Sequence, residues 1–311
     1  MQERYRVLGN TPLIRAEKLG KFLEIESLYI KYEGSNPTGT QKDRPASVHV
    51  LAAISAGYDT IVVGSCGNYG AAIAYYAHLN HLKSRVYIPK GFHSSRIEEI
   101  EKNYGATLVL VEGKYENSVE ASKRDATVNS WFDGNAGAHP DLGLEAYSKV
   151  SSEIFGSIGE TPETVSVPVG NGTTLAGIHY GFVRLREWGE IKKVPRMIAA
   201  STDGGNPVVE SFKKGQKEIT DFPVEMIRET EINEALVNYH SYDGAPAYNA
   251  LLESKGYAEY VTDEDLMSYR DLVRKYESID PLPPAVASLA ATVRVVRKER
   301  ISGIHVAILT G

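Results

Sequence analysis

The chain has 311 residues, of which 42% are hydrophobic and 24% are charged, and this balance is typical of a globular protein with a sizeable core. The formal net charge is -6, and the 34 Lys and Arg residues are dispersed along the chain. Because binding to a polyanion requires a concentrated basic surface, we expect no nucleic-acid partner. Cys66 is the only cysteine, which excludes an intramolecular disulfide and a thiolate zinc cluster and suits a reducing compartment.

The apolar runs of the sequence have the length of strands, for example residues 60–64 and 305–309. A helix that crosses a bilayer needs about 20 apolar residues, so these runs are too short. The first ten residues contain Glu3, Arg4 and Arg6 without an apolar stretch, which is unlike a secretory signal. We therefore expect a cytoplasmic protein with no membrane partner.

Short apolar runs alternate with longer segments of helical periodicity, and this alternation predicts βα units around mostly parallel open sheets. The predicted strands are residues 28–32, 60–64, 85–89, 107–111, 164–169, 196–200 and 304–309. The predicted helices are residues 71–81, 94–104, 142–155, 174–188, 263–276 and 285–297, with a further helical stretch from Pro45. The irregular, charge-rich residues 212–249 are predicted to be an insertion, a lid or an interface element.

Unusual loops follow four of the predicted strands, and ligands bind at the carboxyl ends of strands in open α/β sheets, so we expect the loops to converge. The first loop, GSNPTGTQKDR at residues 34–44, is rich in turn formers and places Lys42 near the start of a helix. A lysine amine becomes nucleophilic when burial or a neighbouring cation lowers its pKa, and Arg44 is such a cation. Taken alone, this segment fits a solvated surface loop better than an active site.

The second loop is SCGNYG at residues 65–70, between a predicted strand and an Ala-rich helix. Backbone amides at such a junction bind anions, because the first helical turn has unpaired N–H groups and the helix dipole favours negative charge. Asn68 adds a side-chain amide that can hold a phenolic or carboxylate oxygen. The alternative is that Ser65 or Asn68 is only a helix cap.

The third loop is GNGTT at residues 170–174, where two glycines, successive amides and the hydroxyls of Thr173 and Thr174 can cradle a phosphate. The next glycine is Gly177, which does not fit a dinucleotide fingerprint, and the sequence contains no P-loop motif. A small phosphate-bearing cofactor therefore suits this loop better than NAD or ATP. The fourth loop follows the last strand and presents the hydroxyl of Thr310, which taken alone fits a cap or turn residue better.

Together and in this order, the four loops resemble those of the fold type II pyridoxal-phosphate (PLP) enzymes, the tryptophan-synthase-β-like family. LGNTPL at residues 8–13 adds the start that is common in this family, so the resemblance runs from Leu8 to Gly311. Within the family, the chain is most similar to threonine synthases through GTQKDR, SCGNYG, PVGNG and the LTG at its end. Each motif is weak alone, but five motifs in the order of the family are specific.

The resemblance implies a role for each motif. Lys42 would carry PLP as a Schiff base and shuttle protons, Asn68 would contact the phenolic oxygen of the cofactor, and Thr310 would face its pyridine nitrogen. A hydroxyl at that nitrogen does not enforce protonation of the ring, which favours elimination and replacement over transamination. The residues implied to bind the cofactor phosphate are Gly170, Asn171, Gly172, Thr173 and Thr174. The residues implied to bind the substrate are Ser65, Cys66, Gly67, Asn68, Tyr69, Arg44 and Arg96.

The resemblance also implies two domains. A large PLP-binding domain would comprise residues 1–48 and 142–311, and a small inserted α/β domain would comprise residues 49–141. The cofactor would lie in the cleft between them, and closure of the cleft would exclude water from the reaction.

We expect a PLP-dependent lyase of amino-acid biosynthesis, a threonine synthase that converts O-phospho-L-homoserine and water to L-threonine and phosphate. The substrate phosphate needs cationic partners, and Lys90, Arg96 and Arg44 are the candidates, although Arg96 also fits a helix-surface arginine. We expect a homodimer that acts on a small-molecule amino acid. His78 and His81 lie three residues apart on a predicted helix, but without a thiolate or carboxylate beside them we expect no metal site.

Two alternatives stay open. The first is another activity on the same cofactor: β-replacement on a serine derivative, as in cysteine or cysteate synthases, or dehydration of serine or threonine. The second is a non-catalytic α/β protein that binds a nucleotide or phosphate through residues 170–174. A PLP enzyme absorbs visible light, whereas a non-catalytic module would be colourless.

Overall fold

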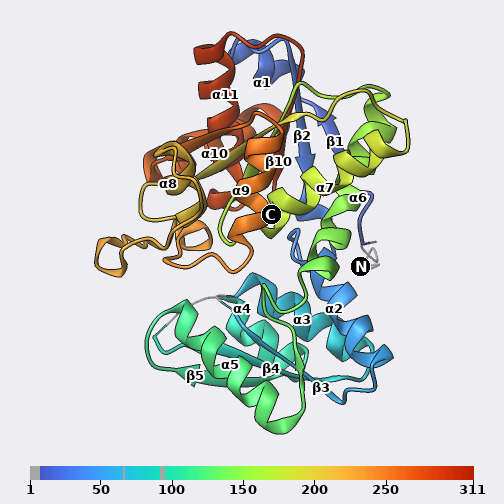
Figure 1. The fold of residues 1–311 in the computed structure, drawn as a ribbon, viewed down its shortest axis with the longest axis vertical. Helices are drawn as coiled ribbons and strands as arrows, with labels where there is room; N and C mark the ends of the chain where they lie inside the picture. The colour runs from blue at the N-terminus through green and yellow to red at the C-terminus, as the bar shows by residue number, and fades with distance from the viewer. Residues whose placement is uncertain (1–7, 66, 92–94) are drawn as a thin grey trace. The chain divides into compact units, whose positions relative to one another are not determined.

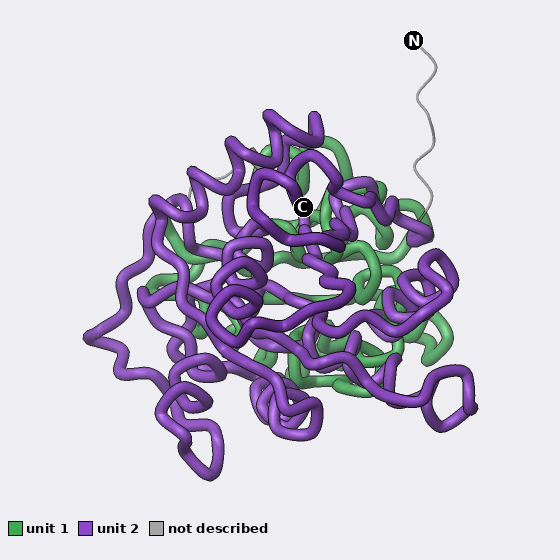
Figure 2. Tube along the Cα trace, turned by 90° about the horizontal axis from the view of Figure 1, so that it is seen from above, with its two compact units in different colours: residues 1–8, 36–146 green, residues 9–35, 147–311 purple. Residues whose placement is uncertain are grey.

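The structure, a computed structural model, describes residues 8–65, 67–91 and 95–311. The chain forms two compact units, coloured separately in Figure 2. Unit 1 contains Leu8 and residues 36–146, and unit 2 contains residues 9–35 and 147–311. Each unit has its own mostly parallel sheet with flanking helices (Figure 1), so the predicted α/β class is confirmed.

The sheet of unit 2 has six strands in the order β1-β2-β10-β7-β8-β9, and every neighbouring pair is parallel except β1 with β2. Its strands are β1 (Leu13–Arg15), β2 (Ser27–Tyr32), β7 (Thr164–Pro168), β8 (Arg196–Thr202), β9 (Tyr257–Val261) and β10 (Ile304–Leu309). The sequence predicted all of these strands except β1 and β9. Both lie at the edges of the sheet, where strands are only partly buried and lack the continuous apolar run of a central strand.

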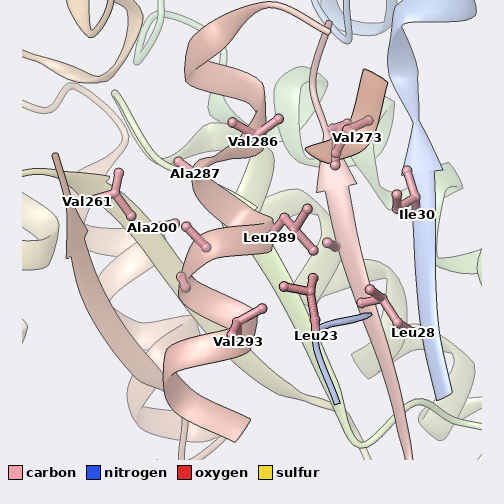
Figure 3. Packing of buried hydrophobic residues seen from close by; sticks show 14 of the residues in the cluster. Leu23, Leu28, Ile30, Ala200, Val261, Val273, Val286, Ala287, Leu289 and Val293 are labelled. Atoms are coloured by element: carbon pink, nitrogen blue, oxygen red, sulfur yellow. The ribbon is translucent and has the colours of Figure 1, made fainter. Parts of the chain in front are cut away.

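Helices cover both faces of this sheet. Figure 3 shows α11 (Ala287–Glu299) packed against the strands, and its Leu289 belongs to the same buried cluster as Leu28 of β2 and Ala200 of β8. The intervening strand residues, such as Ile308, are equally buried, as expected for a parallel sheet covered on both sides. The other helices of unit 2 are α1 (Glu17–Phe22), α7 (Thr173–Glu187), α8 (Pro207–Lys213), α9 (Gly244–Glu253) and α10 (Asp263–Glu277), and a 3-10 turn, η5 (Pro283–Val286), precedes α11.

The sheet of unit 1 has four parallel strands in the order β5-β4-β3-β6. They are β3 (Thr60–Gly64), β4 (Lys83–Pro89), β5 (Thr107–Val111) and β6 (Phe132–Asp133), of which only the two-residue β6 was not predicted. The helices are α2 (Asp43–Ser55), α3 (Asn68–Leu79), α4 (Ser95–Glu98) and α5 (Tyr115–Asn129), and α6 (Pro140–Ile158) continues into unit 2. Val62 packs against α5, whereas Ile61 and Val63 pack with α2 and α3, so both faces of β3 are covered.

The segment predicted as one helix over residues 94–104 is different in the structure. After the four residues of α4, the chain widens into a π-helical turn, η2 (Glu99–Asn103). The π turn brings together side chains that are five residues apart in the sequence. The Tyr104 hydroxyl thus donates to the Glu99 carboxylate at 2.8 Å. Such π turns are rare and occur preferentially at functional sites.

The segment predicted to be irregular, residues 212–249, is largely so. Between the end of α8 and the start of α9 it contains only two 3-10 turns, η3 (Val224–Met226) and η4 (Glu234–Leu236). No helix in the described part of the chain is long and apolar enough to span a bilayer.

Candidate active site

The loop that carries Lys42 leaves β2 through a 3-10 turn, η1 (Glu33–Ser35), and Lys42 stands immediately before α2. The neighbouring Asp43 holds the loop, because its carboxylate accepts hydrogen bonds from the amide and the hydroxyl of Thr38, at 3.0 and 2.8 Å. Asp43 is fully buried, and burial raises its pKa. The Lys42 side chain is partly buried, and its amine lies 5.7 Å from the centre of the Tyr69 ring. Sequence analysis predicted that Lys42 is a site residue, but it assigned no role to Asp43.

The asparagine loop follows β3 and starts α3. Gly67 precedes the helix with a φ of +109° and offers no side-chain cap. Ser65 supplies one, because its hydroxyl accepts a hydrogen bond from the Gly70 amide at 2.8 Å. The structure therefore contains the helix cap that the sequence suggested as an alternative role for Ser65. The amino end of α3 favours a carboxylate through its dipole and first-turn amides. Cys66 lies outside the described residues.

Tyr69 is held from its hydroxyl end by two partners. The hydroxyl oxygen lies 2.8 Å from the Gly134 carbonyl and 2.5 Å from Nδ1 of His49. Because the hydroxyl has one proton, which the carbonyl accepts, Nδ1–H of His49 must donate to the tyrosine oxygen. His49 is 4% exposed; burial, and secondly the nearby His139, lower its pKa to about 4. A neutral imidazole therefore fixes the Tyr69 ring beside the amine of Lys42.

Arg96 connects the two loops of unit 1. Its Nε donates to Oδ1 of Asn68 at 3.2 Å, and its Nη2 donates to the carbonyl of Thr38 at 2.8 Å. Its Nη1 donates to the Glu99 carboxylate at 2.8 Å. The guanidinium thus binds the loop of Lys42, the loop of Asn68 and the π turn at once.

The other two candidate cations lie in different surroundings. Arg44 is buried in the first turn of α2, with 4% of its surface exposed. Lys90 is largely exposed and pairs with the Glu112 carboxylate at 2.6 Å. Lys90, Arg96 and Arg44 were predicted as candidate partners of the substrate phosphate. Of these three cations, Arg96 is the one that contacts Asn68 in the structure.

The glycine loop of unit 2 lies between β7 and α7. Gly172 precedes α7 with a φ of +98°. A Cβ at Gly172 would lie 2.6 Å from Cβ of Ala247, and a Cβ at Gly170 would lie 2.7 Å from the carbonyl oxygen of Ala235. Only glycine fits these positions, and backbone amides at the start of a helix such as the 15-residue α7 can bind an anion.

The irregular segment of unit 2 binds the side chains of this loop. The hydroxyl of Thr173 donates to the carboxylate of Asp243 at 2.5 Å. The side-chain oxygen of Asn171 accepts from the amide of Tyr242 at 3.2 Å and from Asn238 Nδ2 at 3.4 Å. Sequence analysis did not identify these partners. They lie in the irregular residues 212–249, where no strand or helix periodicity indicates which side chains face the glycine loop.

Thr310 follows β10, which lies between β2 and β7 in the sheet of unit 2. Ala307 of β10 pairs with Ser166 of β7, and Leu309 pairs with Tyr32 of β2. Since the three strands are parallel, the Lys42 loop, the glycine loop and Thr310 all begin at the same edge of this sheet. The second loop, residues 65–70, begins at the carboxyl end of β3, in the sheet of unit 1.

Comparisons with known proteins agree with these features. A sequence model of the family described as "Pyridoxal-phosphate dependent enzyme" matches residues 5–311. The chain is 32% identical to the threonine synthase of Methanocaldococcus jannaschii over 292 residues, which cover 93% of this chain and 70% of that protein. The threonine synthase of Methanosarcina acetivorans is 28% identical over 299 residues, with the same two coverages.

Solved structures share the fold at low sequence identity. Maize serine racemase superposes with a TM-score of 0.80 and 19% identity, covering 97% of this chain and 88% of the racemase. Threonine deaminase isoform 2 of Solanum lycopersicum gives a TM-score of 0.77 and 16% identity, covering 99% of this chain and 85% of the deaminase. The resemblance inferred from the five motifs is confirmed. The chain belongs to the family of pyridoxal-phosphate dependent enzymes, and PLP is its cofactor.

Proposed function

We propose that this PLP-dependent lyase is a threonine synthase, which converts O-phospho-L-homoserine and water to L-threonine and phosphate. The observation that carries the reaction class is the neutral hydroxyl of Thr310, beside the glycine loop at the carboxyl edge of the sheet of unit 2. A hydroxyl partner leaves the cofactor ring a weaker electron sink than a carboxylate would, and this favours elimination and replacement. The substrate is suggested by the threonine synthases to which the chain is similar.

The residues present fit the cofactor. The glycine loop combines two positions that exclude a Cβ with the amino end of a long helix, which suits a phosphate. Lys42 offers a partly buried amine on a loop held by the Asp43 carboxylate. We propose that Lys42 and Asn68 of unit 1, and the glycine loop and Thr310 of unit 2, are cofactor-binding residues.

Bound PLP supplies an electron sink for negative charge that develops on the substrate carbons. The chain contributes the remaining functions. Lys42 would hold the cofactor covalently and move the proton at the substrate Cα. The amides at the start of α3, with Gly67 and Tyr69, would bind the substrate carboxylate, and the Asn68 side chain would donate to the phenolic oxygen of the cofactor.

The substrate phosphate needs a cation, and Arg96 is the stronger of the two guanidinium candidates. Its side chain is 22% exposed, whereas Arg44 is buried within α2. The guanidinium of Arg96 contacts Asn68, Thr38 and Glu99, so it lies beside the asparagine loop that we propose binds the substrate.

The test is incubation of the holoenzyme with O-phospho-L-homoserine while phosphate and threonine are followed together. We expect both products in equal amounts, and we expect Lys42→Ala to lower the rate by about 10²–10⁴-fold, the usual contribution of a positioned acid or base. Borohydride reduction and peptide mapping should place the pyridoxyl label on Lys42. A labelled enzyme that releases no phosphate would reject the proposed substrate.

The alternative activity on the same cofactor has a distinct readout. The structural similarity to a serine racemase and a threonine deaminase makes serine and threonine the substrates to try. Ammonia release from either amino acid, without phosphate release from O-phospho-L-homoserine, would favour a dehydratase. Consumption of a serine derivative only in the presence of a second nucleophile would favour β-replacement.

A further inference from the structure

We propose that Arg96 is a positioning residue that turns the Asn68 carboxamide so that its NH2 group, and not its oxygen, faces the phenolic oxygen of the cofactor. This inference rests on the proposed contact between Asn68 and the cofactor. It is independent of the substrate, and therefore of whether the enzyme makes threonine.

The first step concerns the two ends of the carboxamide. A guanidinium carries only donors, so the atom of Asn68 that meets Nε of Arg96 at 3.2 Å must be the carbonyl oxygen. The amide nitrogen then points away from Arg96. In the part of the chain that the structure describes, Nδ2 of Asn68 makes no hydrogen bond. This nitrogen is therefore a directed donor that a ligand can use.

The second step concerns what the cofactor requires. The phenolic oxygen of PLP carries negative charge and needs a donor. A carboxamide turned the other way would present its own oxygen to that charge, which is repulsive and leaves both oxygens without a proton. Oxygen and nitrogen of an amide have nearly the same shape, so sterics alone does not choose between the two orientations. The contact with Arg96 makes the choice.

The third step concerns why Arg96 itself is fixed. Its Nη1 donates to Glu99 and its Nη2 donates to the carbonyl of Thr38, both at 2.8 Å. Glu99 is held in turn by the hydroxyl of Tyr104, across the π turn. The side chains of Arg96 and Glu99 are only 22% and 25% exposed. Lysine offers one compact ammonium in place of a planar fork and does not reach three acceptors in these directions.

The experiment is a pH titration of the visible absorption of the holoenzyme without substrate, in wild type, Asn68→Ala, Arg96→Gln, Arg96→Lys and the double variant Arg96→Gln/Asn68→Ala. Asn68→Ala removes the donor and should shift the midpoint by about 1–2 pH units, the size of one hydrogen bond to a charged group. Glutamine at position 96 also accepts hydrogen bonds, which frees the carboxamide to turn. Arg96→Gln should therefore shift the midpoint in the same direction.

The double variant separates positioning from an independent effect. If Arg96 acts through Asn68, the double variant titrates like Asn68→Ala alone. Arg124→Gln removes an exposed arginine of α5 and should titrate like wild type. Wild-type midpoints for both Arg96→Gln and Arg96→Lys, or a double variant that shifts by the sum of the single shifts, would overturn the inference. If the expected shifts of the midpoint are found in an enzyme that makes no threonine, only the proposed activity is rejected.

Discussion

The two strand-to-helix junctions, β3 to α3 in unit 1 and β7 to α7 in unit 2, share a backbone device and differ in the side chains around it. Each helix starts after a glycine with positive φ, +109° at Gly67 and +98° at Gly172, and neither glycine provides a cap. At the first junction the neighbouring side chain is a cation, Arg96. At the second it is a carboxylate, Asp243.

This difference decides which groups stay available to a ligand. Arg96 binds the oxygen of Asn68 and leaves the amide nitrogen as a donor. Asp243 binds the hydroxyl of Thr173 and removes that donor, so the backbone amides of α7 are what the second junction offers to a phosphate. In the roles that we propose, the same backbone geometry would support recognition by a side chain in one unit and recognition by the backbone in the other.

The largest effect should come from breaking the second junction with Gly172→Ala. A positive φ costs a non-glycine residue about 1–2 kcal/mol, and the 2.6 Å approach to Ala247 adds an overpacking cost of about 1–3 kcal/mol. We expect a loss of about 2–5 kcal/mol in the free energy of unfolding and weaker cofactor binding, measured by urea denaturation and PLP titration.

The matched control is Gly189→Ala, at the other end of α7. Gly189 has a φ of +80° but no atom within 4 Å of a Cβ, so only the backbone term applies and cofactor affinity should not change. Equal losses of stability and of cofactor affinity in the two variants would show that the Gly172 loop is not crowded.

The first junction should respond to acid through His49. Its pKa in the folded protein is about 4, below the ordinary value of 6.5, so between these pH values the unfolded state binds a proton that the folded state does not. Stability therefore falls as the pH falls through this window, by about 3 kcal/mol for this group. Urea denaturation at several pH values should show a flatter profile for His49→Gln, which keeps a donor for Tyr69. Parallel profiles for wild type and variant would contradict this expectation.

A smaller effect is expected from Ser65→Ala, which removes the cap of the first junction. The Gly70 amide loses its acceptor, and loss of a cap costs about 0.5–2 kcal/mol. Thr127→Ala removes a hydroxyl from the surface of α5 and should change the free energy of unfolding by less than about 0.5 kcal/mol. If the two variants unfold at the same urea concentration, the hydroxyl of Ser65 does not stabilise α3.

The smallest change, Asp243→Asn, makes the second junction more like the first. An amide oxygen still accepts from Thr173, but the negative charge beside the proposed anion site is gone. We expect the Kd for PLP, from absorbance titration of the apoenzyme, to fall by up to about tenfold, which is about 1.4 kcal/mol. Asp203→Asn, at an exposed carboxylate, serves as the control. Weaker binding in Asp243→Asn would mean that the carboxylate is needed to orient Thr173.

The parts of the fold that the sequence predicted are those with a local signal. The central strand β3, buried along its whole length, is a continuous apolar run and was predicted with the bounds that the structure has. The edge strand β9 mixes Tyr and Glu with apolar residues and was not predicted, because only one side of it needs apolar residues. The π turn was predicted as an ordinary helix, since nothing in its residue pattern marks the contact between Glu99 and Tyr104.

The order of residues along the chain determined the family and the cofactor, and it predicted the lysine and the two anion-binding junctions, because each of these depends on a few consecutive residues after a strand. Tertiary structure decided the surroundings of those residues. Arg96 lies 28 residues from Asn68, and Asp243 lies 70 residues from Thr173. Contacts over such separations depend on how the helices and loops pack, which no local periodicity encodes, and they determine which donors remain for a ligand.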